Sequence, residues 1–225
     1  MRLVFASNNA HKLEEVRSMV PDYVSVLSLR DICFEAEIEE TGQTLEENSA
    51  IKAETVREWI IQNPTCTNQD DPIDGVFADD TGLEIDVLGG VPGVYTARWA
   101  MMSGEIKDLT NEQEIFAANR SKALRELEGK ADRGAQFRTV ITLIKLSDGT
   151  NQHQNSVIQV EGVVRGRIAE KEYGTGGFGY DPVFIPEGYD KTFGELPAEI
   201  KNQISHRARA LEALVKEIKS SYDQI

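Results

Sequence analysis

The stretch Val76-Phe77-Ala78-Asp79-Asp80-Thr81-Gly82 decides the fold class of this chain. Its three apolar residues are typical of the end of a buried strand. Two adjacent carboxylates follow, and Thr81-Gly82 predicts a sharp turn. Open α/β sheets form ligand crevices where strands end, and a buried acid pair there needs a cation or a shared proton. We therefore expect an α/β fold with a metal or a carboxylate base at this place; the alternative is a solvated turn between two strands.

The composition limits the classes of function. The 225 residues include 38 acidic and 24 basic side chains, for a formal net charge of -14. Broad binding to nucleic acid or to a membrane surface needs a positive face, so we expect neither. The two cysteines have no C-x-x-C spacing, which favours a reducing cytoplasm. No segment is long and apolar enough to predict a membrane span or a signal peptide.

A polar turn follows the first apolar run, which predicts a buried strand over residues 3–6. The turn is Ser7-Asn8-Asn9-Ala10-His11-Lys12, and the residues after it recur at helical spacing. A helix N-terminus presents free backbone N–H groups, and a lysine in the first turn is favourable when an anion is bound there. We expect a phosphate site; the alternative is a capped helix with a solvated lysine.

A capping box of Thr44 and Glu47 predicts a helix that reaches Ile61. Its apolar stripe contains Lys52, with Asn48 one turn earlier. A lysine in such a position either extends to solvent or neutralises a buried negative charge. We favour the second interpretation because Asn48 points the same way. The polar, proline-containing segment 62–75 predicts a surface loop.

The second half predicts a helix over 110–127, a long hairpin over 135–166 and a glycine-rich loop over 174–181. The loop matches G-x-G-x-x-G, but Pro182 and a strand-like run follow it, which excludes a dinucleotide fingerprint. The loop either lets Phe178 stack on a planar ligand or is a tight structural turn. A C-terminal helix, continuous from Ile200 or restarting at Ser205, carries three bases that predict a basic corner: Lys201, His206 and Arg207.

Together these groups supply lysines for phosphates, carboxylates for a metal and a water, and an aromatic ring for a base. That combination favours metal-assisted phosphoryl transfer from a nucleotide to water. The adjacent acids do not fit a D-x-D phosphatase, and no P-loop motif occurs. A pyrimidine-directed pyrophosphatase and a non-catalytic nucleotide-binding protein remain open as alternatives.

Six blocks, in order from residue 2 to about 215, resemble the inosine triphosphatase family. They are Ser7-x-Asn9-x-x-Lys12, Glu40-Thr41-Gly42 with Glu47-Asn48-x-x-x-Lys52, Ala78-Asp79-Asp80-Thr81-Gly82, Leu88-Gly-Gly-x-Pro92-Gly-x-Tyr95-x-Ala-Arg98, Gly174 to Pro182, and Ser205-His206-Arg207. The departures are Asn8, where many members carry glycine, and a longer loop over 62–75. The resemblance implies a mixed α/β fold: one domain over 1–225 with an elongated central mixed sheet flanked by helices, and two lobes with an active-site cleft between them. The hairpin over 135–166 would extend one lobe, and the protein would be a cytoplasmic homodimer.

The resemblance also implies an activity, the Mg²⁺-dependent hydrolysis of ITP, dITP and XTP to monophosphate and pyrophosphate. Asp80 would be the general base and a metal ligand, and Glu40 a second metal-linked carboxylate. Phe178 would stack on the base. The triphosphate would be bound by Ser7, Asn8, Asn9, Ala10, His11, Lys12 and Lys52, and Thr81 would be a further substrate contact. The base pocket would be shaped by Gly179, Tyr180 and Asp181. The 6-keto edge of the purine would be contacted by Lys201, His206 and Arg207.

Overall fold

The computed structural model describes residues 1–64, 72–102, 104, 111–146 and 156–222, and it divides into two compact units. Unit 1 comprises Met1–Asp80, Thr139–Gly162 and Arg207–Ile225, and unit 2 comprises Thr81–Arg138 and Val163–His206. Three strands contribute residues to both units: β3 (Gly75–Ile85), β5 (Gly134–Lys145) and β6 (Val157–Ile168). Each unit therefore has its own section of β-sheet.

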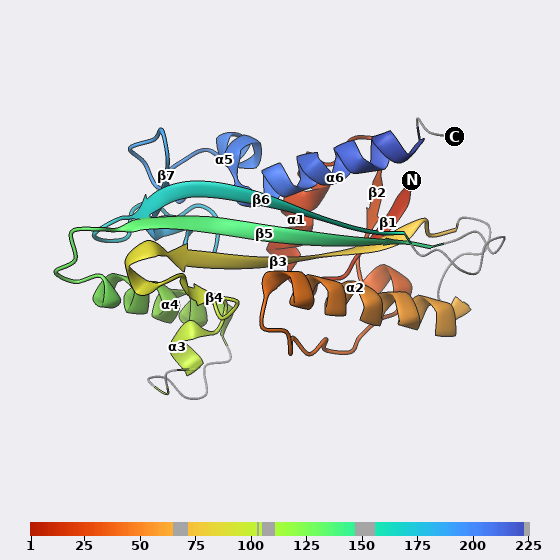
Figure 1. Ribbon diagram of the computed structural model, residues 1–225, viewed down its shortest axis with the longest axis horizontal. Coiled ribbons are helices and arrows are strands. Elements are labelled where there is room, and N and C mark those ends of the chain that lie inside the picture. Colours follow the sequence, from red (N-terminus) through yellow and green to blue (C-terminus); the bar gives the residue numbers. More distant parts are fainter. Residues whose placement is uncertain (65–71, 103, 105–110, 147–155, 223–225) are drawn as a thin grey trace. The chain divides into compact units, whose positions relative to one another are not determined.

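The sheet of unit 1 has the strand order β2 (Ser25–Leu27), β1 (Arg2–Phe5), β3, β5 and β6. β1 is parallel to both of its neighbours, β2 and β3. Helix α2 (Leu45–Gln62) covers one face, and α1 (Ala10–Met19) and α6 (His206–Tyr222) cover the other (Figure 1). Side chains of β1 alternate between these faces, as the two-residue period of a strand requires.

Two apolar cores follow from that alternation. On one face, Leu3 and Phe5 pack with α1 and α6, including Val16 and Leu211. On the other face, Val4 packs with the apolar side of α2 and with the 3₁₀ turn at Arg30–Ile32. Because both faces are covered, the β3 residues between them are buried, including Asp79 and Asp80.

Unit 2 is built on the remaining parts of the long strands. Its sheet has the order β4 (Val91–Gly93), β3, β5, β6 and β7 (Phe184–Pro186), with antiparallel pairing of β4 to β3 and of β7 to β6. Its helices are α3 (Trp99–Met102), α4 (Glu112–Glu126) and α5 (Ala198–Ile204). One core joins α4 to the sheet and to the segment after the glycine-rich loop.

The structure corrects one expectation and decides another. The expected turn at Thr81-Gly82 is wrong, because β3 continues from Gly75 to Ile85 and Asp79 and Asp80 lie inside it. Leu83 and Ile85 are fully buried in the core of unit 2, which favours continuation of the strand. The C-terminal helix does restart, because α5 ends at Ile204 and α6 begins at His206.

Other expectations fall partly outside the described residues. Residues 65–71 of the loop expected over 62–75, and residues 147–155 of the hairpin expected over 135–166, lie outside the described residues. The mixed α/β class is confirmed, whereas one domain made of two lobes stays a prediction. Within the described part of the chain, no helix combines the length and apolar character that crossing a membrane requires.

Candidate active site

The first cluster of predicted residues lies in unit 1, around the amino group of Lys52. Its Nζ is 2.9 Å from Oδ1 of Asp80 and 2.6 Å from Oε1 of Glu40. Asn48, one turn earlier on α2, donates from Nδ2 to Oδ2 of Asp80 at 3.3 Å. All of these groups except Glu40 are buried. The helical spacing that predicted an inward Asn48 and Lys52 is therefore confirmed.

The chain before α2 is fixed by the same asparagine. Oδ1 of Asn48 accepts a hydrogen bond from the backbone N–H of Gly42 at 2.8 Å. A Cβ at Gly42 would lie 2.6 Å from that oxygen, so this close approach requires glycine. The N-cap is Thr44, as predicted, and its Oγ1 accepts from the N–H of Glu47 at 3.1 Å. These contacts hold the segment that carries Glu40 beside the start of α2.

The second carboxylate of the pair, Asp79, has different partners. Its Oδ1 is 2.8 Å from Nζ of Lys12, and its Oδ2 is 3.0 Å from Nε of Arg207. Arg207 also pairs through Nη1 with Glu15 on α1. Asp79 is 1% exposed and Arg207 is 2% exposed. This buried cluster connects β3 with the first turns of α1 and α6.

The two adjacent carboxyls have opposite pKa shifts. Burial raises the pKa of Asp80, and the attraction of Lys52 and Lys12 does not fully reverse that effect. Burial also acts on Asp79, but Lys12 and Arg207 outweigh it and hold the pKa of that carboxyl far below its usual range. Of the two, Asp80 has the more basic carboxylate, which suits a general base.

The two lysines also differ. Burial lowers the pKa of Lys12, and Asp79 only partly offsets it. For Lys52, Asp80 and Glu40 outweigh the effect of burial and raise the pKa. Lys52 therefore stays protonated between two carboxylates. Lys12 has one acidic partner among these contacts and lies in the first turn of α1, where the helix dipole disfavours a positive charge.

The polar turn before α1 has the predicted form. Asn9 is the N-cap, and its Oδ1 accepts from the N–H of Lys12 at 3.0 Å. The N–H of Asn9 reaches Oγ of Ser7 at 3.3 Å. Asn8 and Ala10 are exposed, and His11 is half-buried. The turn brings backbone N–H groups and Lys12 to one place, which is the arrangement of an anion site.

A second cluster lies in unit 2, around the ring of Phe178. Nζ of Lys201 is 4.8 Å from the centre of that ring and 2.7 Å from Oδ2 of Asp181. The same oxygen accepts from the N–H of Phe178 at 2.8 Å. Asp181 therefore orders both the loop backbone and the lysine. Tyr180 is buried, and its hydroxyl donates to the carbonyl of Thr96 at 3.1 Å.

Glycines make the tight loop of this second cluster possible. Gly174, Gly177 and Gly179 all have positive φ. A Cβ at Gly177 would overlap the carboxylate of Asp181, and one at Gly174 would overlap the backbone carbonyl of Gly194. The loop is thus closely packed on one side, while the ring of Phe178 stays partly exposed.

The three predicted bases near the C-terminus have different partners. Lys201 pairs with Asp181, and the ring of His206 stacks on Phe137 with 4.6 Å between ring centres. Arg207 pairs with Asp79 and Glu15 in unit 1. A single basic corner made by these three side chains stays a prediction. Thr81, predicted as a substrate contact, follows Asp80 in β3 and is half-buried.

Sequence reasoning missed several residues of these clusters. Asp79 received no role of its own, because the family resemblance implied a base and a metal ligand only at Asp80. Glu15 occupies an ordinary position on α1, so its contact with Arg207, 192 residues away, gave no local signal. The inward position of Asn48 was predicted from the stripe that it shares with Lys52, but its hydrogen bond to Asp80 was not.

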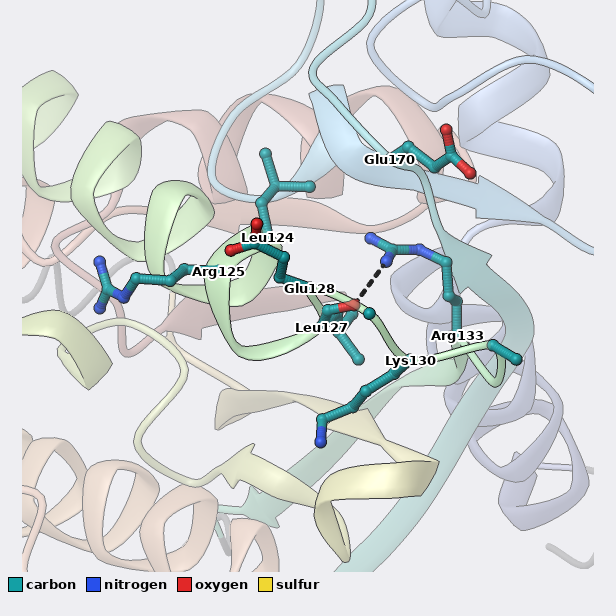
Figure 2. Close-up of a pocket in the computed structure, with 9 residues that line it drawn as sticks. Leu124, Arg125, Leu127, Glu128, Lys130, Arg133 and Glu170 are labelled. Atoms are coloured by element: carbon teal, nitrogen blue, oxygen red, sulfur yellow. Dashed lines mark hydrogen bonds between the residues drawn. The ribbon is translucent and has the colours of Figure 1, made fainter.

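A pocket of about 590 Å³ in unit 2 contains none of the predicted site residues (Figure 2). It lies around the end of α4, and its lining includes Leu124, Arg125, Leu127, Lys130 and Glu170. Arg133, also in the lining, donates to the carbonyls of Leu127 at 3.0 Å, Ile168 at 2.7 Å and Ala169 at 2.7 Å. These bonds give Arg133 a structural role in joining α4 to the end of β6.

Comparison with known proteins assigns the chain to a family. The sequence matches the Ham1 family over residues 3–217. The chain belongs to the Ham1 family. This assignment confirms the resemblance to the inosine triphosphatases, and the match includes every predicted site residue.

Curated and solved members of the Ham1 family are similar along nearly the whole chain. A dITP/XTP pyrophosphatase of Flavobacterium johnsoniae is 46% identical and covers 96% of both chains. One of Bacillus subtilis is 42% identical over 95% of this chain and 94% of its own. The Ham1 protein of Staphylococcus aureus has a TM-score of 0.75 at 33% identity, covering 98% of this chain and 100% of its own. The mixed α/β fold is therefore that of solved Ham1 structures.

Proposed function

We propose that this chain is a dITP/XTP pyrophosphatase that hydrolyses ITP, dITP and XTP to the nucleoside monophosphate and pyrophosphate. Its near full-length similarity to two Ham1 relatives of that name supports the substrate class. The observation that carries the chemistry is the buried contact of Asp80 with Lys52, next to the Asp79–Lys12 pair. A carboxylate base and cations for phosphate oxygens are the groups that phosphoryl transfer to water needs.

In this mechanism the residues of unit 1 act on the triphosphate. The turn from Ser7 to Lys12 and the side chains of Lys12 and Lys52 bind phosphate oxygens. Asp80 accepts a proton from the water that attacks the α-phosphorus, and pyrophosphate leaves. Asn48 fixes the orientation of the Asp80 carboxylate through its 3.3 Å hydrogen bond. Asp79 and Arg207 keep Lys12 in place.

Glu40 and Asp80 are chemically suited to Mg²⁺. Among the described residues, no group of three or more His, Cys, Asp and Glu side chains could hold a metal by itself. Mg²⁺ typically binds through one or two carboxylates plus substrate phosphate oxygens, so two carboxylates meeting at Lys52 fit this mode. When bound, the ion would neutralise charge on the phosphates and lower the pKa of a water.

In the same proposal the residues of unit 2 recognise the purine. Phe178 stacks on the base, and Gly179, Tyr180 and Asp181 shape its pocket. Lys201 and His206 donate hydrogen bonds to the 6-keto oxygen, which adenine's amino group cannot accept. The ion pair of Lys201 with Asp181 supports a fixed donor position. A donor role for Arg207 stays a prediction, because its Nε and Nη1 contact carboxylates.

We further propose that the protein acts as a homodimer in the cytoplasm. Cys33 is exposed and in no disulfide, which is compatible with a reducing compartment. The excess of 38 acidic over 24 basic residues supports small-molecule substrates in preference to nucleic acid or membrane surfaces.

The decisive experiment measures product release from a nucleotide panel. Purified protein is incubated with ITP, XTP, dITP, ATP, GTP, dTTP and UTP, and pyrophosphate and orthophosphate are measured separately. We expect pyrophosphate from the first three, and loss of this release when EDTA removes Mg²⁺. Orthophosphate as the sole product would contradict attack at the α-phosphorus. A preference for dTTP or UTP would favour a pyrimidine-directed enzyme, and tight ITP binding without turnover would favour a binding protein.

A further inference from the structure

One arginine of α4 contacts two points of the glycine-rich loop segment. Nη1 of Arg120 donates to the backbone carbonyl of Gly179 at 2.9 Å. Its Nε forms an ion pair with Oε2 of Glu172 at 2.9 Å. Glu172 precedes the loop, and Gly179 directly follows Phe178. A single guanidinium therefore joins both ends of the segment to one helix.

The same face of α4 also reaches the aromatic ring of the loop. Phe116 lies one helical turn before Arg120, and residues four apart share a face of a helix. The ring centres of Phe116 and Phe178 are 6.2 Å apart with a 39° angle between planes. This distance is within the range of favourable aromatic pairs. The helix thus supports the loop by an apolar contact as well as by a polar one.

The loop needs such support because of its own composition. Gly174, Gly177 and Gly179 give its backbone more conformational freedom than other residues would, and fixing that freedom costs free energy. The Asp181 carboxylate orders one end, through the N–H of Phe178. The carbonyl of Gly179, the next residue, accepts a hydrogen bond from Arg120, which orders the loop at that point. The side chain of Arg120 is 14% exposed and that of Glu172 is 39% exposed, so solvent screens the ion pair and the hydrogen bond to Gly179 does more of the ordering.

We propose that Arg120 is a positioning residue for purine binding, because its guanidinium fixes the loop that presents Phe178 to the base. The proposal rests on the proposed function of Phe178 and assigns Arg120 no contact with substrate. The chemistry at Asp80 does not depend on this loop in our mechanism. Loss of Arg120 therefore weakens substrate binding, while the rate from bound substrate changes little.

The test compares Arg120→Met with Arg125→Met, a matched change on the same helix at an exposed position. We expect Arg120→Met to raise KM for ITP about tenfold, because the change removes one hydrogen bond to a charged group. The kcat value should stay within about threefold of the wild-type value. Amide hydrogen exchange in residues 172–180 of the nucleotide-free protein should become about tenfold faster. Arg125→Met should match the wild type in both measurements.

Two further variants keep the proposal falsifiable if Arg120→Met does not fold. Arg120→Lys keeps the charge but cannot reproduce the two-point contact, so its KM should lie between those of the wild type and Arg120→Met. Glu172→Gln removes the ion pair alone and should raise KM about threefold. An unchanged KM, or unchanged exchange in residues 172–180, in any folded Arg120 variant overturns the inference. A wild-type protein that releases no pyrophosphate from ITP instead refutes the proposed function, and the exchange measurement still tests the Arg120–loop contact.

Discussion

Replacing Asp79 by asparagine should destabilise the fold, because the change removes the negative charge between Lys12 and Arg207 while keeping the size of the side chain. The carboxylate lies 2.8 Å from Lys12 and 3.0 Å from Arg207, and the three side chains are 1%, 16% and 2% exposed respectively. Removing one partner of a buried ion pair costs about 3–5 kcal/mol. At about 2–4 °C per kcal/mol for a chain of this size, the unfolding midpoint should fall by about 6–20 °C.

The measurement is thermal unfolding followed by circular dichroism at pH 7 in EDTA, with a urea titration for the free energy. Asp31→Asn is the matched control, since that carboxylate lies 3.4 Å from Arg17 and the two side chains are 45% and 48% exposed. The hydrogen bonds that Ser28 donates to Asp31 can be kept by the amide oxygen of asparagine, so the change mainly removes the charge. An exposed pair contributes less than about 1 kcal/mol, so the control should unfold within about 4 °C of the wild type. If Asp79→Asn unfolds no earlier than Asp31→Asn, the buried cluster does not stabilise the protein and this reasoning is refuted.

Two further predictions concern the reaction. Asp80→Asn should lower kcat for pyrophosphate release by about 10²–10⁴-fold, while calorimetry still detects ITP binding. A variant that keeps more than a tenth of the wild-type rate would exclude Asp80 as the base. Phe178→Ala should raise KM for ITP about 5- to 150-fold, because stacking on a base contributes about 1–3 kcal/mol. An unchanged KM would show that the ring does not stack on the purine.

Local patterns predicted the helices and their buried faces well. The inward position of Lys52 followed from the 3.6-residue period of α2, and Thr44 followed from the capping box. The same local reasoning failed at Thr81-Gly82, where turn propensity predicted that the strand ends, whereas β3 continues to Ile85. Burial of Leu83 and Ile85 decided that outcome, and such tertiary packing is not visible in a short window of sequence.

The candidate site shows a similar division. Residue types and family motifs were enough to select Lys12, Lys52 and Asp80, since phosphate and metal chemistry restricts the side chains that can serve. The different roles of Asp79 and Asp80 depend on partners far away in the chain, such as Arg207, 128 residues from Asp79. Arg120 is a further case, because its contact with Gly179 spans 59 residues and no helical period predicts it.

The close packing around Gly174 and Gly177 limits how the base preference of this protein could be altered by random mutagenesis. Substitutions at these two positions would collide with Gly194 and Asp181 and would be lost from any library selected for folding. The side chain of Phe178 is partly exposed, and its replacement by a smaller one causes no such overlap. Variants that accept a different nucleobase should therefore carry changes at 178 and almost none at the two glycines.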